Sequence, residues 1–120
     1  MAEHNLLGER GEELVKSFLQ KLGYKIIAIN WRERKFEIDI IAIDKNEIVF
    51  VEVKTRSTSF FGTPEEAVTI KKQEHLVNGA DCYIQKYEVD LECRFDVVSV
   101  ILNNNQKEIK HFKNAFLPEF

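Results

Sequence analysis

The chain has 120 residues, of which 44% are hydrophobic and 31% are charged, and its formal net charge at pH 7 is −3. This length and composition predict one domain, spanning residues 1–120, with a hydrophobic core. The net negative charge argues against a protein that binds nucleic acid tightly and without specificity, because such proteins carry a basic surface.

The first residues, MAEHNLLGERGEE, are polar and acidic, and they lack the basic flank and apolar run of a signal peptide. No apolar run in the sequence approaches the length needed to span a membrane. Cys82 and Cys93 are not part of a CxxC motif, so we expect reduced thiols rather than a disulfide framework or a zinc site. We therefore expect a cytoplasmic protein with no membrane partner.

Helices and strands can be assigned from hydrophobic spacing and from start and stop signals. Apolar residues recur at helical spacing over residues 5–22, and Gly23 follows as a helix stop. Thr63, Pro64 and Glu66 together form a helix-start signal. In chain order we predict a helix over 5–22, a strand over 24–30, a polar connection over 31–35, strands over 36–44 and 47–55, a helix from 63 to about 87 with a break near 70–72 as an open alternative, and strands over 94–102 and 107–113.

The two central strands are apolar on both faces. In the first of them, Ile38, Ile40 and Ala42 should point to one side, because side chains alternate along a strand. Ile41 and Ile43 should point to the other side. A sheet that is apolar on both faces must be covered on both faces. The sequence therefore predicts an α/β fold in which a mixed central β-sheet is flanked by helices on both faces.

Charged residues interrupt these two apolar strands: Glu37 and Asp39 in the first, Glu52 and Lys54 in the second. A hairpin with a loop of two or of four residues places Asp39 directly opposite Glu52. The same register places Glu37 opposite Lys54, and all four side chains then point to one side of the sheet. A three-residue loop would instead place the two central carboxylates on opposite sides of the sheet.

Two carboxylates that face each other destabilise a hairpin, especially near a covered face of low dielectric constant. A divalent cation removes this cost, and two carboxylates with a main-chain carbonyl and water suit Mg²⁺ or Mn²⁺. Lys54 is near enough in sequence to touch a water or phosphate oxygen on that cation. Glu12 lies at the edge of the apolar stripe of the first helix, from which it could reach the same site. The alternative interpretation is a solvent-exposed strand end, with Glu37 and Lys54 as a surface ion pair and Glu12 as an ordinary boundary residue.

A helix glutamate followed by Asp39, Glu52 and Lys54 in the spacing D-x12-E-x-K resembles the core of the PD-(D/E)xK nucleases. The wider sequence resembles the YraN family of small uncharacterised bacterial proteins, and the resemblance covers nearly the whole chain. That family is assigned to the restriction-endonuclease-like fold and is similar to archaeal Holliday-junction resolvases. The segments that carry the resemblance are GERGEELVKSFLQKLGYKIIAIN, EIDIIA, VFVEVKTR, FGTPEEAV, RFDVV and the terminal NAF.

The resemblance implies a restriction-endonuclease-like core and a role for each charged residue. Asp39 and Glu52 would be the ligands of Mg²⁺ or Mn²⁺, Lys54 would orient or deprotonate the attacking water, and Glu12 would assist from the helix. The implied substrate is DNA rather than RNA, with branched or repair intermediates as the expected form.

Two positions depart from the pattern. Ile38 stands where the nuclease motif has proline, and Phe36 stands where the family usually has glycine before Glu-Ile-Asp. Neither change removes a reactive group, but Phe36 adds bulk beside the site and would narrow access for a substrate.

Basic and aromatic residues near the predicted site are candidates for contacts to nucleic acid, through phosphate for the cations and through base stacking for tryptophan. The alternative for each is a solvated charge or an aromatic at the edge of the core. The three histidines show no ligand spacing and are expected to be surface or packing residues. The candidates are Arg32, Arg34, Lys35, Arg56, Lys72, Gln73 and Trp31.

These observations predict a metal-dependent endonuclease that hydrolyses phosphodiester bonds in DNA. The alternatives are a non-catalytic nucleic-acid-binding module and a protein-interaction module that retains the nuclease fold. The presence of Asp39, Glu52 and Lys54 argues against an inactive relative, whereas the acidic net charge argues for one. We also consider a homodimer, because 120 residues offer little surface for gripping branched DNA.

Overall fold

The computed structural model describes residues 3–57 and 68–117. Both thiols in this part of the chain, Cys82 and Cys93, are free, as expected. Within it, no helix is long and apolar enough to cross a membrane. The elements in chain order are α1 (Glu3–Lys21), β1 (Lys25–Glu33), β2 (Phe36–Asp44), β3 (Glu47–Arg56), α3 (Ile70–Tyr87), β4 (Glu92–Asn103) and β5 (Gln106–Phe112).

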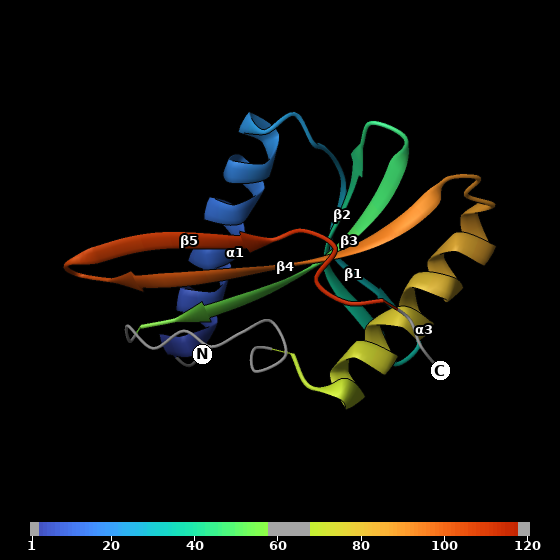
Figure 1. Cartoon of the computed structure of the whole chain (residues 1–120). Coiled ribbons are helices and arrows are strands. Elements are labelled where there is room, and N and C mark those ends of the chain that lie inside the picture. Colours follow the sequence, from blue (N-terminus) through green and yellow to red (C-terminus); the bar gives the residue numbers. More distant parts are fainter. Residues whose placement is uncertain (1–2, 58–67, 118–120) are drawn as a thin grey trace.

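The strands form one sheet in the order β1-β2-β3-β4-β5. Strands β3 and β4 are parallel, with α3 as the crossover between them, and the other neighbouring pairs are antiparallel. Helix α1 covers one face of the sheet and α3 covers the other (Figure 1). The predicted α/β fold with a mixed sheet between helices is therefore confirmed, and it is compatible with a nuclease-like core.

Each helix contributes to its own half of the core. On the α1 side, Val15 and Leu19 pack against Ile40 and Val51 of the central strands. On the α3 side, a second cluster is built in the same way around Phe50. Because both helices bury apolar stripes against the sheet, the two central strands are held rigidly from both sides.

Helix α1 approaches β3 most closely at Gly11. A Cβ atom at this position would overlap the side chain of Thr55 on β3. Glycine is therefore required for the helix to lie directly on the strand. This close approach fixes the position of the next residue, Glu12, above the sheet.

Strand β1 is longer than predicted, because the sequence WRERK was expected to be a connection. Residues 31–33 continue the strand, and Trp31 pairs with Ile38 of β2. The turn is instead confined to residues 34–35, with Arg34 in the left-handed region at φ 57°. The prediction failed because β1 lies at the edge of the sheet, where alternating polar residues are compatible with a strand.

The side chains of β2 exchange faces at Asp39. Ile40 packs on the α1 side, as predicted, but Ile38 packs on the α3 side, so the predicted common face for these two residues is wrong. The same exchange occurs in β1, where Asn30 has a positive φ of 52°. A residue with positive φ interrupts the regular alternation of side chains along a strand. The residues before and after Asn30 therefore face opposite sides of the sheet, whereas in a regular strand they would share one side.

Helix α3 is described from Ile70, with Thr69 as its N-cap, and it ends at Tyr87, as predicted. The Thr69 hydroxyl accepts a hydrogen bond from the Lys72 N–H at 3.2 Å. The predicted helix start at Thr63, Pro64 and Glu66 lies outside the described residues.

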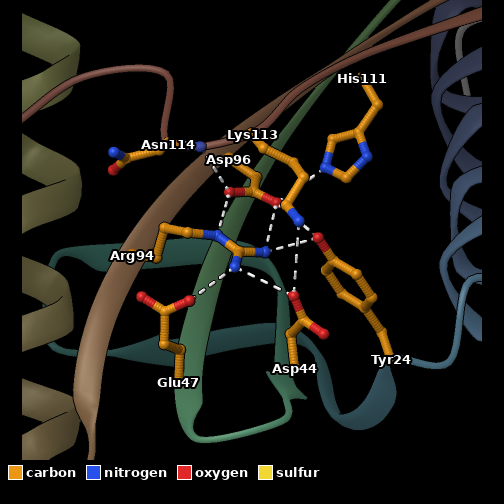
Figure 2. Close-up of polar contacts among 8 residues, drawn as sticks. All are labelled: Tyr24, Asp44, Glu47, Arg94, Asp96, His111, Lys113 and Asn114. Atoms are coloured by element: carbon orange, nitrogen blue, oxygen red, sulfur yellow. Dashed lines mark hydrogen bonds and ion pairs between the residues drawn. The ribbon is translucent and has the colours of Figure 1, made fainter.

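A buried polar network, which the sequence analysis did not identify, closes the end of the sheet where the β2–β3 turn lies (Figure 2). Arg94 lies at its centre and contacts Asp96, Asp44 and Glu47 at 2.9, 3.0 and 2.8 Å. Tyr24 also hydrogen-bonds to Arg94 and Asp96. Figure 2 shows these side chains converging on the guanidinium group from three strands and from the residue that precedes β1.

The Asp96 carboxyl group stays ionised because of its neighbours, although its side chain has no solvent exposure. Burial alone would raise the pKa of this carboxyl group, but hydrogen bonds from His111, from Arg94 and from the Asn114 N–H lower the pKa to about 2. His111 packs edge-on against Phe18 and Tyr24, which fits the expectation of a packing residue, and it also has a polar role as the partner of Asp96. Because the network joins β4 to the β2–β3 turn, it fixes the closed end of the hairpin.

Replacing Arg94 should cost much of the stability of the fold. The change Arg94→Met leaves the buried Asp96 without its cation, and we expect the free energy of unfolding to fall by about 3–5 kcal/mol. Chemical denaturation measures this difference. The control is Lys113→Met, since Lys113 is 59% exposed and lies 3.8 Å from Asp44; it should change stability by less than about 1 kcal/mol. Equal effects of the two substitutions would contradict the structural role of the network.

Candidate metal centre

The sheet forks between β2 and β3. Their main-chain pairing runs from the turn to Ile40 and Val51 and stops there. Beyond this point β2 stays with β1, whereas β3 stays with β4 as far as Arg56. The predicted register is therefore confirmed up to Ile40 and Val51, and the strands separate where the next pair would be Asp39 and Glu52.

Asp39 occupies the opening of the fork. Its carboxylate accepts a hydrogen bond from the Val53 N–H of β3 at 2.8 Å. In an unbroken antiparallel ladder, that N–H would bind a main-chain carbonyl of β2. The side chain thus replaces the main chain as the link between the strands, and it lies between them.

The carboxyl groups of Asp39 and Glu52 meet in this opening. The two groups lie close enough that each perturbs the pKa of the other. Burial, together with the negative charge of Asp39, raises the pKa of Glu52 to about 8. Burial also raises the pKa of Asp39, against the opposing hydrogen bond from Val53. Near neutral pH the pair therefore retains a proton in the absence of a cation.

Two lysines face this pair from different elements. The Lys72 ammonium, from the first turn of α3, lies 3.9 Å from the Glu52 carboxylate. Lys54 lies two residues beyond Glu52 on β3 and is half-buried. The positive charges of Lys72 and Lys54 both lower the pKa of Glu52, although burial outweighs them.

Glu12 approaches Asp39 from α1. Its carboxylate accepts a hydrogen bond from the Asn30 side chain at 3.0 Å. Burial raises the pKa of Glu12 despite this bond, and the charge of Asp39 adds to the rise. A cavity of about 410 Å³ connects the two carboxylates, and Asn30, Arg32 and Glu37 also line it.

The structure thus brings Glu12, Asp39, Glu52 and Lys72 together, with Lys54 beside them. Asn30 is a member of this group to which sequence reasoning gave no role. Asparagine tolerates positive φ better than most residues, which suits position 30, but no local signal in the sequence points to its bond with Glu12.

Several other predicted contacts are not formed. Glu37 pairs with Arg32 of β1 at 2.7 Å, and not with Lys54 as predicted, because β2 has left β3 at this point. The Trp31 ring packs edge-on against Tyr83 of α3, with the ring centres 5.3 Å apart, and this packing supports the core-edge alternative over base stacking.

The remaining candidates for contacts to nucleic acid have different surroundings. Gln73 is buried, and its side chain donates a hydrogen bond to the Val68 carbonyl at 3.1 Å. Arg34, Lys35 and Arg56 are exposed, so they remain free to contact a partner in solution.

The donor set of the fork fits a hard divalent cation with open coordination positions. In residues 3–57 and 68–117, no group of three or more histidine, cysteine, aspartate or glutamate side chains is arranged to enclose a metal. Two carboxylates alone are nevertheless a usual protein contribution to Mg²⁺, which keeps several waters or takes substrate phosphates as its other ligands. Asp39 and Glu52 therefore fit Mg²⁺ or Mn²⁺ better than a closed structural metal.

Comparison with known proteins identifies close relatives over nearly the whole chain. Residues 11–100 match the uncharacterised protein family UPF0102, which is the YraN family suggested by the sequence. A UPF0102 protein of Bacteroides thetaiotaomicron is 47% identical over 118 residues, which are 98% of each chain. One of Flavobacterium psychrophilum is 47% identical over 116 residues, which are 97% of this chain and 98% of the relative. One of Porphyromonas gingivalis is 44% identical over 97% of this chain and 87% of the relative.

The carboxyl pair should make the metal-free protein lose stability as pH rises. Folding raises the pKa of Glu52 from 4.5 to about 8, so the folded state binds more protons than the unfolded state between these values. Stability is then fully present below about pH 4.5 and is lost as pH rises through 8. Glu52→Gln cannot ionise, and it should exceed the wild type in free energy of unfolding by at least about 1 kcal/mol at pH 9 but not at pH 5.

Denaturant unfolding with a chelator present measures this difference. The matched control is Glu13→Gln, a substitution at an exposed position of the same helix that carries Glu12. A Glu52→Gln variant that is no more stable than the wild type at pH 9 would show that ionisation of Glu52 does not destabilise the folded protein.

Proposed function

We propose that this chain, which belongs to the uncharacterised protein family UPF0102, is a metal-dependent nuclease that hydrolyses phosphodiester bonds in DNA. The observation that carries the proposal is the placement of Asp39 in the opening between two strands, where it accepts the Val53 N–H and lies close enough to Glu52 for each carboxyl group to perturb the pKa of the other. Such a pair is costly without a cation, and it lies beside lysines suited to phosphate or water.

Each residue of the site has a task in this proposal. Asp39 and Glu52 would hold one Mg²⁺ or Mn²⁺. The bound cation would polarise the phosphate, lower the pKa of the attacking water and stabilise negative charge on the leaving oxygen. Lys54 orients the attacking water or takes its proton. Glu12, held by Asn30, lies across the cavity from Asp39 and positions a second water or the leaving group.

The chemistry around the site supports a phosphate-containing substrate. Lys72 and Lys54 lie next to the carboxyl pair, and Arg56 is exposed at the end of β3 beyond Lys54. Cations on a rim around a carboxylate-held metal match the charge of a nucleic-acid backbone. The preference for DNA, and for branched or repair intermediates, follows from the resemblance to the PD-(D/E)xK nucleases and resolvases.

A non-catalytic module that binds nucleic acid or protein is the second candidate. The net charge of −3 favours the protein-binding form of this candidate, because a protein that holds DNA ordinarily carries a more basic surface. Only the nuclease requires a divalent cation at the fork, so metal binding separates the two candidates.

Binding of the cation should depend on Asp39. Isothermal titration of the full chain with Mn²⁺ should give about one site, and Asp39→Asn should weaken binding at least about tenfold, because one of two charged ligands is lost. The matched control is Asp81→Asn on the exposed face of α3, which should bind as the wild type does. If Asp39→Asn binds Mn²⁺ with the same affinity as the wild type, the metal site does not lie in the fork.

Cleavage of DNA should depend on Lys54. With Mn²⁺ and linear, single-stranded and branched DNA, we expect Lys54→Met to reduce the single-turnover rate at least about 100-fold, which is the usual range for a group that moves or orients a reacting proton. Lys113→Met, at the opposite end of β2 and β3, should leave the rate unchanged. Cleavage that persists in Lys54→Met would point to a contaminating nuclease and end the catalytic assignment.

A further inference from the structure

We infer that Lys72 is a displaceable counter-ion of the metal centre. In the metal-free protein its ammonium group balances the negative charge that remains on the carboxyl pair, and when Asp39 and Glu52 hold a divalent cation the ammonium group is released to bind a phosphate of the substrate. This inference rests on the proposed function, and it adds a residue on α3 that links metal binding to substrate binding.

The geometry of the ion pair is the first reason. The Lys72 ammonium lies 3.9 Å from a Glu52 carboxylate oxygen, so the two groups are within ion-pair range but too far apart for a hydrogen bond. The Glu52 side chain is 7% exposed, whereas that of Lys72 is 36% exposed. Glu52 is therefore fixed in the interior, while the ammonium reaches it from the surface and can return there.

The anchoring of α3 is the second reason. The Lys72 N–H donates to the Thr69 hydroxyl, and the neighbouring Gln73 side chain donates to the Val68 carbonyl. These bonds fix the main chain at the start of the helix. The exchange of the ammonium group between Glu52 and a phosphate therefore needs only a movement of the flexible Lys72 side chain, and not of the helix.

The charge balance gives the direction of the exchange. The carboxyl pair attracts one positive partner, and within the described residues Lys72 is the cation that forms an ion pair with Glu52. A divalent cation on the same carboxylates carries a larger charge of the same sign as the ammonium group. The two cations repel each other, so the one held more weakly and at longer range, Lys72, leaves.

A place for the released side chain exists beside the pair. A cavity of about 440 Å³ runs along the first turns of α3 and opens to solvent, and Lys71, Lys72, His75 and one carboxylate, Glu74, line it. The first turn of this helix has no acidic residue. A phosphate group that enters here would meet two lysine side chains near the metal, which suits the anionic backbone of a nucleic acid.

Chemical labelling of lysine tests the displacement directly. The full chain is acetylated briefly with an N-hydroxysuccinimide ester, either with chelator or with Mg²⁺, and labelling at each lysine is followed by peptide mass spectrometry. An amine that leaves an ion pair is acylated faster, so Mg²⁺ should raise the labelling rate of Lys72 at least about threefold. Lys71, the exposed next residue, is the internal control and should not change.

The outcomes separate this inference from the proposed function. If Mg²⁺ binds in calorimetry but the Lys72 rate stays constant or falls, the inference is wrong and the proposed function stands. If Mg²⁺ does not bind the wild type at all, both fail. The Mg²⁺ effect on Lys72 should also vanish in Asp39→Asn; an effect that persists there would arise outside the fork and overturn the inference.

Binding of an oligonucleotide tests the second half of the exchange. Ca²⁺ is used to occupy the site without supporting rapid cleavage, and the probe is a 20-nucleotide single strand. Lys72→Met should weaken binding about fivefold with Ca²⁺ and leave binding in chelator unchanged. Equal weakening in both conditions would make Lys72 a permanent contact, and no weakening in either would remove its role toward phosphate.

Discussion

The site depends on one interruption of main-chain pairing, the separation of β2 from β3 after Ile40 and Val51. An interrupted ladder leaves backbone donors without partners, which is costly in a core. Here the Asp39 carboxylate replaces the missing acceptor for Val53, so a functional side chain also completes the hydrogen bonding of the sheet. Because the interruption falls at this pair, Asp39 and Glu52 meet in the opening between the strands instead of facing each other across a closed ladder.

The two ends of the β2–β3 hairpin solve the same electrostatic problem in different ways. At the closed end, Arg94 compensates Asp44 and Glu47 through hydrogen bonds of 3.0 and 2.8 Å, and the charges are balanced inside the protein. At the open end, the carboxyl pair has a retained proton, the Lys72 ammonium at 3.9 Å and the nearby charge of Lys54. The closed end therefore holds the strands in place. At the open end the negative charge is not fully compensated without a cation, which is typical of binding sites more than of structural ion pairs.

The sequence predicted the helices, the central strands and the hairpin register, because alternating apolar residues and turn signals determine them locally. It also predicted Asp39 directly opposite Glu52; the two carboxyl groups are near each other, but the ladder that was expected to pair them ends at Ile40 and Val51. The fork could not be predicted, because it arises from the face exchange at Asn30 and Asp39, where tertiary packing of Ile38 against α3 overrides strand alternation. The Arg94 network could not be predicted for a different reason: its members come from distant parts of the chain, so no local pattern joins them.

The central claim is that Asp39 and Glu52 hold one divalent cation in the opening of the sheet. Crystals of the full chain grown or soaked with Mn²⁺, measured near the manganese absorption edge, test this claim most directly. The account predicts a single strong anomalous peak about 2–2.5 Å from one oxygen of each carboxylate, with water in the remaining positions. A peak bound elsewhere, or an ordered fork with no peak at saturating Mn²⁺, would contradict it.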